Sequence, residues 1–303
     1  MKKNMIFAAI AALALTACSN DDEIKVGGDN AILLTSSLNV AETRAATDIQ
    51  TSAFDAGETV DVYITENEPG TNETHYNQPI LATTKTGGAL DLQDGPYYYP
   101  TSGNGVNIYA LYPATAATGE LFTIKEDQST DANYKASDLM YGKPATNNPV
   151  SPSANAVDIQ FSHLLSKVTI NLIAGENVTS LDGAKVELLG VKPSTTLTAS
   201  KDGCSIAPAS GTAASITVMT ATETVTSGSA IIVPQTLPEM FLQVTLDGAT
   251  LTGKLASGAP ELTAGNAYTY NITVNMRGGA LEIEGSITPW DDGGTDIGTV
   301  NPQ

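Results

Sequence analysis

The chain has 303 residues, of which 33 are acidic and 14 are basic, and its formal net charge at pH 7 is −19. A polyanion of this kind repels DNA, RNA and anionic lipid heads, because binding them needs a basic surface that releases counterions. We therefore expect no nucleic-acid partner. Apolar residues make up 41% of the sequence, and beyond the first eighteen residues its length fits two domains of roughly 120 to 140 residues each.

The first seventeen residues have the features of an export signal. Lys2 and Lys3 precede an apolar, alanine-rich run from Met5 to Leu15. At about eleven residues this run is too short for a transmembrane helix, which needs roughly 20. It leads into Leu-Thr-Ala-Cys, which matches the lipobox of bacterial lipoproteins, where the cysteine is diacylated and becomes the mature N-terminus. We predict a signal peptide over residues 1–17, lipidation of Cys18 and attachment to the outer membrane through that lipid.

An acidic stretch, Ser-Asn-Asp-Asp-Glu at residues 19–23, follows directly. It resembles the export signal that sends Bacteroidetes lipoproteins to the outer face of the outer membrane. The plainer interpretation is a solvated tether between the lipid and the folded protein. Either way, we expect residues 18–44 to precede the first domain.

The segment Ala31–Val40 alternates between apolar and mostly polar positions, which is typical of a strand with one buried face. It is followed by Glu-Thr-Arg-Ala-Ala at residues 42–46, where Arg44 lies in a small, polar, loop-like environment that suits a protease. In isolation, such an arginine is usually only a solvated charge. The predicted buried face consists of Ile32, Leu34, Leu38 and Val40.

Helical periodicity is weak in the rest of the chain, whereas alternating apolar runs bounded by Gly, Pro, Asn and Asp recur. We predict an all-β protein. The segment Gly142–Pro152 is rich in Pro and Asn and is typical of a loop near a domain boundary, so the predicted domains cover residues 45–157 and 158–303. The expected strands are Ala31–Val40, Thr59–Thr65, Val106–Tyr112, Ala156–Phe161, Lys167–Ile173, Ala184–Leu189, Ser215–Met219, Gly228–Val233, Phe241–Leu246, Leu251–Leu255, Ala267–Val274, Leu281–Ile287 and Asp296–Val300.

Chemically reactive residues are few and scattered. Cys204 is the single cysteine after Cys18, so no disulfide can form within the mature domains. The two histidines, His75 and His163, are far apart in the sequence and have no Cys or His neighbours, which does not fit a zinc site. We therefore predict no catalytic residue, no cofactor and no metal, and we interpret His163 as a packed structural residue.

Several phrases of the sequence follow the order and spacing of one protein family. They are YYYP at residues 97–100, NIYALYP at 107–113, DLMYG at 138–142, FSHLLSKVTINL at 161–172, IIVPQTL at 231–237, GNAYTYNITV at 265–274 and ITPWDDG at 287–293. Together with the lipobox and the Thr-Arg-Ala junction at residues 43–45, they make the chain resemble the fimbrillin family of Bacteroidetes, whose members are subunits of type V pili.

This resemblance implies two tandem transthyretin-like β-sandwich domains and a structural role in fimbriae at the cell surface. It also implies an assembly cycle in which a trypsin-like protease cuts the lipoprotein after an arginine and the N-terminal strand leaves. A strand from an identical or related subunit then fills the open groove by strand addition. In this chain, Arg44 would be the cleavage residue, Ala45 the new N-terminus and Ala31–Val40 the released strand.

The resemblance also requires a donor strand, for which we favour the C-terminal run. Its apolar residues alternate with polar ones and continue beyond a Gly-rich turn. The alternative is that they form the last strands of the second domain. The expected donor residues are Leu281, Ile283, Ile287, Ile297 and Val300.

Two other functions stay open at this point. The first is an accessory or tip adhesin that accepts a donor strand without passing one on, with ligand recognition in the polar stretch Glu66–Asn77. The second is a surface glycan hydrolase with paired carboxylates, although no cluster of acids with flanking aromatic residues marks a sugar cleft. We expect that the protein is not an enzyme.

Overall fold

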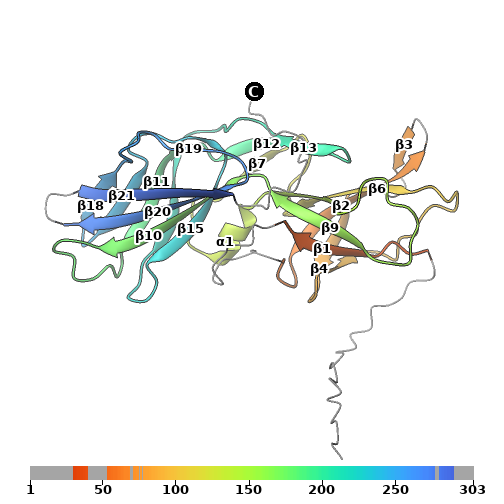
Figure 1. Ribbon diagram of the computed structural model, residues 1–303, viewed down its shortest axis with the longest axis horizontal. Coiled ribbons are helices and arrows are strands. Elements are labelled where there is room, and N and C mark those ends of the chain that lie inside the picture. Colours follow the sequence, from red (N-terminus) through yellow and green to blue (C-terminus); the bar gives the residue numbers. More distant parts are fainter. Residues whose placement is uncertain are drawn as a thin grey trace, which may run out of the picture.

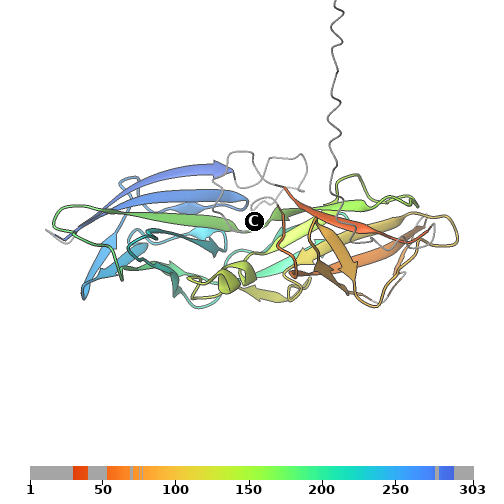
Figure 2. The same ribbon diagram turned by 90° about the horizontal axis from the view of Figure 1, so that it is seen from below.

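The computed structural model describes residues 30–39, 53–68, 71–74, 76, 78–276 and 280–289. In this part of the chain there are 21 strands and a single α-helix of six residues, α1 (Asp131–Ala136). The predicted all-β class is therefore confirmed. The strands form two lobes arranged along the longest axis of the molecule, and α1 lies between them (Figures 1 and 2).

The first lobe is a sheet of eight strands in the order β3-β2-β4-β5-β1-β9-β8-β6. Because β2 also pairs with β6, seven of these strands close into a ring, and β3 extends β2 outside it. The strands are β1 (Leu34–Leu38), β2 (Thr59–Glu68), β3 (Thr71–Thr74), β4 (Ile80–Thr84), β5 (Ala89–Leu92), β6 (Val106–Tyr112), β8 (Met140–Pro144) and β9 (Val157–His163).

The second lobe contains two four-stranded sheets. One has the order β15-β10-β20-β21 and the other the order β14-β11-β17-β18. The strands are β10 (Ser166–Ala174), β11 (Lys185–Val191), β14 (Ala214–Thr220), β15 (Ser227–Ile232), β17 (Leu242–Leu246), β18 (Ala249–Gly253), β20 (Asn266–Asn275) and β21 (Ala280–Pro289).

Smaller strands add further pairings, and the segment before and within α1 contacts both lobes. The strand β7 (Leu121–Thr123) pairs with β12 (Ser194–Ser200), which also pairs with β13 (Gly203–Ile206). A two-stranded sheet joins β16 (Gln235–Thr236) to β19 (Glu261–Leu262). Lys135 on α1 forms ion pairs with Asp55 and Glu58 of the first lobe. Just before α1, the Gln128 side chain bonds to the backbone of Ile231 on β15 of the second lobe.

Buried side chains form two clusters. The first fills the closed sheet and runs from Ile32 to Phe161 in sequence. The second lies in the second lobe, but it also takes in Leu111, Phe122 and Tyr141 from earlier in the chain. The segment carrying β7 and α1 thus packs with the second cluster, although it precedes residue 157. The predicted domain boundary at that residue stays a prediction.

The segment predicted as a boundary loop, Gly142–Pro152, is partly a strand, because β8 continues to Pro144. Gly142 pairs with Phe161 in the sheet. A Cβ atom at Gly142 would lie 2.8 Å from the side chains of both Ile159 and Phe161. The glycine at this position therefore allows close packing, and the loop interpretation of Gly142–Pro144 was wrong.

Candidate strand-exchange groove

The segment expected to be released forms β1, which lies inside the closed sheet. It runs antiparallel to β5, with Leu34 opposite Leu90 and Thr35 opposite Ala89. It runs parallel to β9 through five paired positions, from Leu34 with Val157 to Leu38 with Phe161. Both edges of β1 are therefore paired, and removing it would separate β5 from β9 and open the ring.

One face of β1 is buried, as the alternation in the sequence predicts. Ile32 and Leu34 are each 3% exposed and Leu38 is 6% exposed. Leu38 lies opposite Phe161, whose ring makes an edge contact with Phe54 at a centroid distance of 4.9 Å. The segment from Ile32 to the end of β1 thus contributes three aliphatic side chains to the first cluster, worth about 5–9 kcal/mol together at roughly 1.5–3 kcal/mol each.

Ser36 is the polar exception on this buried face. Its hydroxyl donates a hydrogen bond to the Gly88 carbonyl at 3.0 Å, and its backbone N–H donates to the same oxygen at 2.7 Å. Gly88 has φ +85°, and a Cβ atom there would lie 2.8 Å from the Ser36 carbonyl oxygen. Glycine is needed at this position both for its backbone conformation and for the close approach of β1.

Backbone hydrogen bonds hold the two ends of β1. The Ile32 N–H donates to Tyr97 O at 2.8 Å, and the Asn39 N–H donates to Phe161 O at 2.7 Å. In a third bond, the Val157 N–H of β9 donates to Leu33 O at 2.8 Å. Bonds of this kind do not depend on the side chains of the inserted strand, so another strand with apolar residues at alternate positions could make them.

On the outer face of β1, Asp158 of β9 accepts two side-chain hydrogen bonds. The Ser37 hydroxyl donates to Asp158 Oδ2 at 2.7 Å, and the Thr35 hydroxyl donates to Asp158 Oδ1 at 3.3 Å. These contacts fix the register between β1 and β9. Sequence reasoning missed this role of Asp158, because the parallel pairing joins residues that are far apart in the chain.

The predicted donor run begins in β21, which pairs antiparallel with β20 over ten positions. Leu281 lies opposite Val274, Ile283 opposite Ile272, and both pack against the second cluster. Gly253 of β18 leaves room for them, because a Cβ atom there would lie 2.7 Å from Ile283 Cδ1. Within the described residues, β21 is thus the last strand of its own lobe, which agrees with the alternative interpretation of this run.

Several predicted site residues lie outside the described residues. They are the lipidation residue, the two cleavage residues, one residue of the released strand and two of the donor run, namely Cys18, Arg44, Ala45, Val40, Ile297 and Val300. Their predicted roles stay predictions. The register of β21 continues through Ile287, opposite Tyr268.

Two of the reactive residues singled out in the sequence, Cys204 and His163, are buried, and His75 lies outside the described residues. Burial raises the pKa of the Cys204 thiol to about 12, so this cysteine is protonated and unreactive at neutral pH. His163 is 2% exposed, and its Nδ1 lies 2.9 Å from Asp138 Oδ1. Among the described residues, no group of three or more His, Cys, Asp or Glu side chains could hold a metal ion.

Asp61 is an acid that sequence reasoning did not single out. It lies on β2, opposite Leu111 of β6, and is 8% exposed. Burial raises the pKa of its carboxyl group to about 6. Burial, followed by the Asp61 charge and Tyr109, also raises the pKa of Tyr63 to about 12. Tyr63 stacks on Tyr109 at a centroid distance of 4.5 Å, and both rings pack against the second cluster.

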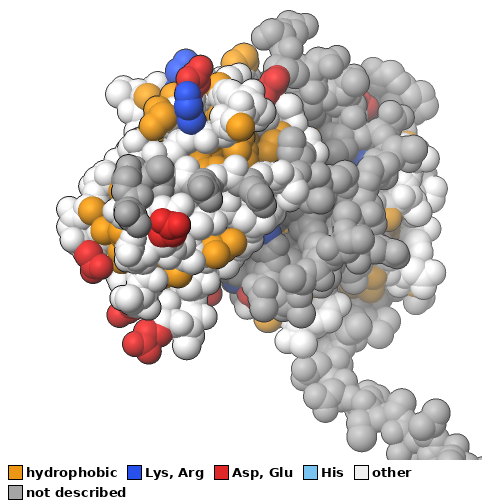
Figure 3. Space-filling view, turned by 60° about the vertical axis from the view of Figure 1, so that its left-hand side comes forward, with side chains coloured by type: hydrophobic (Ala, Val, Ile, Leu, Met, Phe, Trp, Pro, Cys, Tyr) orange, Lys and Arg blue, Asp and Glu red, His pale blue; other side chains and the backbone are white. Residues whose placement is uncertain are grey.

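The surface agrees with the acidic composition. On the described part of the face shown in Figure 3, Lys and Arg side chains are few, and Asp and Glu side chains are spread from the lower left to the top. No helix among the described residues has the length and apolar character needed to cross a membrane.

A family model described as fimbrillin-like matches residues 43–290. The chain therefore belongs to the fimbrillin-like family, and the family resemblance seen in its sequence is confirmed. No curated protein matches the chain.

Two solved structures with TM-scores of 0.60 or more share the fold. A candidate cell adhesion protein from Bacteroides ovatus is 20% identical, with a TM-score of 0.65, and the alignment covers 87% of this chain and 99% of that one. A candidate cell adhesion protein from Bacteroides uniformis gives a TM-score of 0.60 at 20% identity, with the same coverage of both chains. The tip fimbrial protein Mfa3 from Porphyromonas gingivalis, truncated at its C-terminus, is 10% identical with a TM-score of 0.48, over 86% of this chain and all of that one.

Proposed function

We propose that this protein is a structural subunit of a surface fimbrium, exported as a lipoprotein and polymerised by exchange of β1. The observation that supports the proposal most directly is the position of β1 in the closed sheet. It is a short strand with one apolar face, it is paired on both edges, and it precedes the rest of its lobe in the chain. Membership of the fimbrillin-like family supports the same role.

In this proposal, cleavage after Arg44 makes β1 separable and leaves Ala45 as the new N-terminus. Before cleavage, β1 is tethered to the lobe that it completes, so it rebinds as soon as it leaves. After cleavage, its departure becomes a bimolecular equilibrium and a strand from another subunit can compete for the groove. The 28 acids and 10 bases that remain give the processed subunit a net charge of −18, because cleavage removes five acids and four bases from the 33 and 14 of the whole chain.

Two tandem transthyretin-like domains are part of the same proposal. The supporting observation is a repeated pairing in the two lobes. In the first, the strand that comes first in the chain, β1, lies parallel to β9, and in the second the first strand, β10, lies parallel to β20. Domains of related topology would give this repeat.

The proposed donor is the C-terminal run with Leu281, Ile283, Ile287, Ile297 and Val300. Leu281, Ile283 and Ile287 lie on β21. If they were donated to another subunit, β21 would have to leave β20, which would expose the fully buried residues Ile272 and Val274. If only the residues after β21 were donated, the pairing of β21 with β20 would stay intact. Ile297 and Val300 are therefore the donor residues that the energetics favour.

The sequence has two arginines, Arg44 and Arg277, so an arginine-specific protease tests the proposal cleanly. We expect the purified precursor to be cut after Arg44, with Ala45 as the new N-terminal residue in mass spectrometry, and then to form a ladder of denaturant-resistant oligomers. The variant Arg44→Ala should stay monomeric under the same treatment, whereas Arg277→Ala should still polymerise.

A monomeric product after complete cleavage at Arg44 would contradict the polymerisation role. A second experiment separates a stalk subunit from an accessory or tip subunit. Deletion of residues 290–303 should stop a stalk subunit from adding the next subunit, whereas incorporation of a tip subunit would be unaffected. Native gel electrophoresis of cleaved wild-type and truncated mixtures measures both outcomes.

A further inference from the structure

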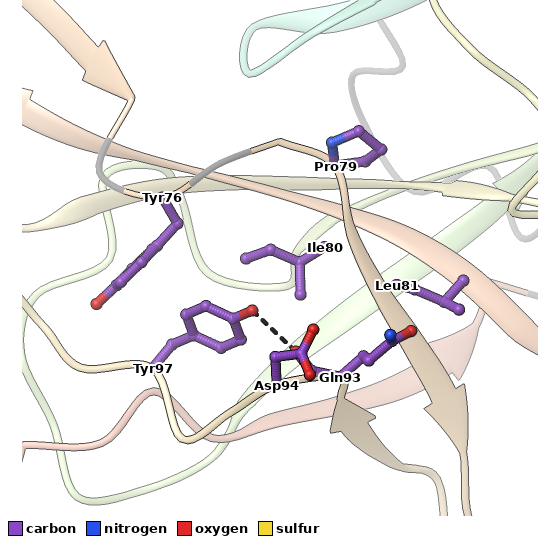
Figure 4. Close-up of a pocket in the computed structure, with 7 residues that line it drawn as sticks. All are labelled: Tyr76, Pro79, Ile80, Leu81, Gln93, Asp94 and Tyr97. Atoms are coloured by element: carbon purple, nitrogen blue, oxygen red, sulfur yellow. Dashed lines mark hydrogen bonds between the residues drawn. The ribbon is translucent and has the colours of Figure 1, made fainter.

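A pocket of about 440 Å³ lies on the first lobe, between β4 and the turn that follows β5 (Figure 4). Sites for small molecules generally have volumes of about 300–1,000 Å³ and combine apolar or aromatic walls with a few polar groups. Ile80 and Leu81 contribute from β4, while Gln93, Asp94 and Tyr97 come from the turn, and Tyr76 closes one side.

Two tyrosine rings form the aromatic wall. The rings of Tyr76 and Tyr97 are nearly perpendicular, at 76°, with centroids 4.7 Å apart. Their hydroxyls are already engaged, because Tyr97 donates to Gln93 O at 2.8 Å and Tyr76 bonds to the backbone of Tyr98. The rings are thus held in place, and their surfaces are what they offer to a ligand.

The polar groups of the pocket are the side chains of Gln93 and Asp94, which are both exposed. Neither side chain has a hydrogen-bond partner among the described residues, although the Gln93 backbone does. Together they offer one amide donor and two kinds of oxygen acceptor. Among the described residues, no lysine or arginine lines the pocket, so an anionic ligand would meet the Asp94 carboxylate without a compensating cation from them.

Backbone hydrogen bonds hold the turn that carries these groups. Gln93 N–H donates to Leu81 O at 2.8 Å, and Tyr97 O accepts from the Ile32 N–H at 2.8 Å. Asp94 has φ +61°, a left-handed conformation that Asp tolerates better than most residues. A site held in this way loses little conformational entropy when a ligand binds.

We propose that this pocket binds a neutral sugar residue of a glycan. A pyranose ring has an apolar C–H face that fits against the tyrosine rings and adjacent hydroxyls that match the Gln93 amide and the Asp94 carboxylate. This inference adds ligand recognition to the subunit and does not depend on strand exchange, because the pocket is complete in the uncleaved chain.

The test uses the full precursor and the methyl glycosides of glucose, galactose, mannose and N-acetylglucosamine, with sialic acid as the anionic comparison. We expect saturation-transfer NMR to show contact for at least one neutral sugar and none for sialic acid. Gln93→Ala should weaken binding about threefold to tenfold, as expected for losing a neutral hydrogen bond, and Asp94→Gly by about tenfold or more, because its bond involves a charged group. Glycine suits the positive φ at residue 94, so this variant keeps the turn intact.

The control variants are Tyr98→Ala, which removes a tyrosine that is 45% exposed beside the pocket, and Gln160→Ala, which removes an exposed glutamine on β9. Both should bind sugar like the wild type. The proposal is overturned if no neutral sugar binds at tens of millimolar, if sialic acid binds best, or if Gln93→Ala and Asp94→Gly both keep wild-type affinity while they unfold at the wild-type temperature.

Discussion

The first strands of the two lobes, β1 and β10, have the same kinds of neighbouring strands but differ in how many backbone pairs they form. Each is parallel to a later strand of its lobe and antiparallel to another on its opposite edge. β10 follows β9 after two residues and has eight parallel and six antiparallel pairs, whereas β1 has five parallel and two antiparallel pairs. The proposed exchange therefore requires fewer backbone pairs to break at β1 than the loss of β10 would require.

The largest expected effect comes from truncating a buried side chain in each of these strands. Leu34→Ala on β1 and Ile170→Ala on β10 should both lower the free energy of unfolding of the uncut chain by about 2–5 kcal/mol, measured by chemical denaturation. After cleavage at Arg44 their effects should diverge. Leu34→Ala should speed the loss of β1 at least tenfold, and Ile170→Ala should leave that rate unchanged, as followed by hydrogen exchange of β5 and β9.

The next prediction compares two adjacent glycines with almost the same backbone conformation. Gly87 has φ +84° and nothing within 4 Å of the position that a Cβ atom would take, whereas Gly88 has φ +85° and a Cβ there would lie 2.8 Å from Ser36 O. Gly87→Ala should lower stability by about 1 kcal/mol, from backbone strain alone. Gly88→Ala should lose about 1–3 kcal/mol more, because the methyl group pushes against β1. Equal losses in urea denaturation would contradict this role of Gly88.

A smaller effect on stability is expected from Asp61, and it should depend on pH. The pKa of Asp61 is raised to about 6 in the folded protein from 3.8, so its protonated form favours folding. That contribution is complete below about pH 4 and is lost as the pH rises through 6. Asp61→Asn should therefore be more stable than the wild type at pH 7, on the order of 2 kcal/mol. The two proteins should converge below pH 4, as measured by urea denaturation at each pH.

The smallest effect concerns the outer face of β1. Asp158→Ala removes the acceptor for the Ser37 and Thr35 hydroxyls and should lower the free energy of unfolding by about 1 kcal/mol. In the cleaved protein, Asp158→Ala should speed the release of β1 by about fivefold, because a loss of about 1 kcal/mol corresponds to a fivefold change in rate. Gln160→Ala on the same strand is the matched control. If both variants release β1 at the wild-type rate, the hydrogen bonds to Asp158 do not hold the strand.

Long strands with clear alternation could be predicted from the sequence. The boundaries expected for Val106–Tyr112 agree with β6, and those for Lys167–Ile173 and Ala267–Val274 agree with β10 and β20 to within one residue. Short or polar strands were missed. β12, with the sequence STTLTAS, has few apolar residues, and its strand conformation depends on pairing with β7 and β13.

The helix was missed because six residues carry too little periodicity. It begins at a Thr130 N-cap, whose side chain accepts from Asn133 N–H at 3.4 Å, and contacts with both lobes hold it in place. Of the groove, the buried face of β1 could be predicted, because alternation is local. Its partners Gly88 and Asp158 could not, because pairing across more than fifty residues leaves no local pattern.

The closed ring has a consequence for the direction of growth of a polymer. If β1 leaves, the exposed edges belong to β5 and β9, and the two run in opposite directions relative to the missing strand. A replacement that restores the same hydrogen bonds must run antiparallel to β5 and parallel to β9. It can therefore enter in only one orientation. Every subunit joined in this way would point the same way along the fibre, which would have two chemically different ends.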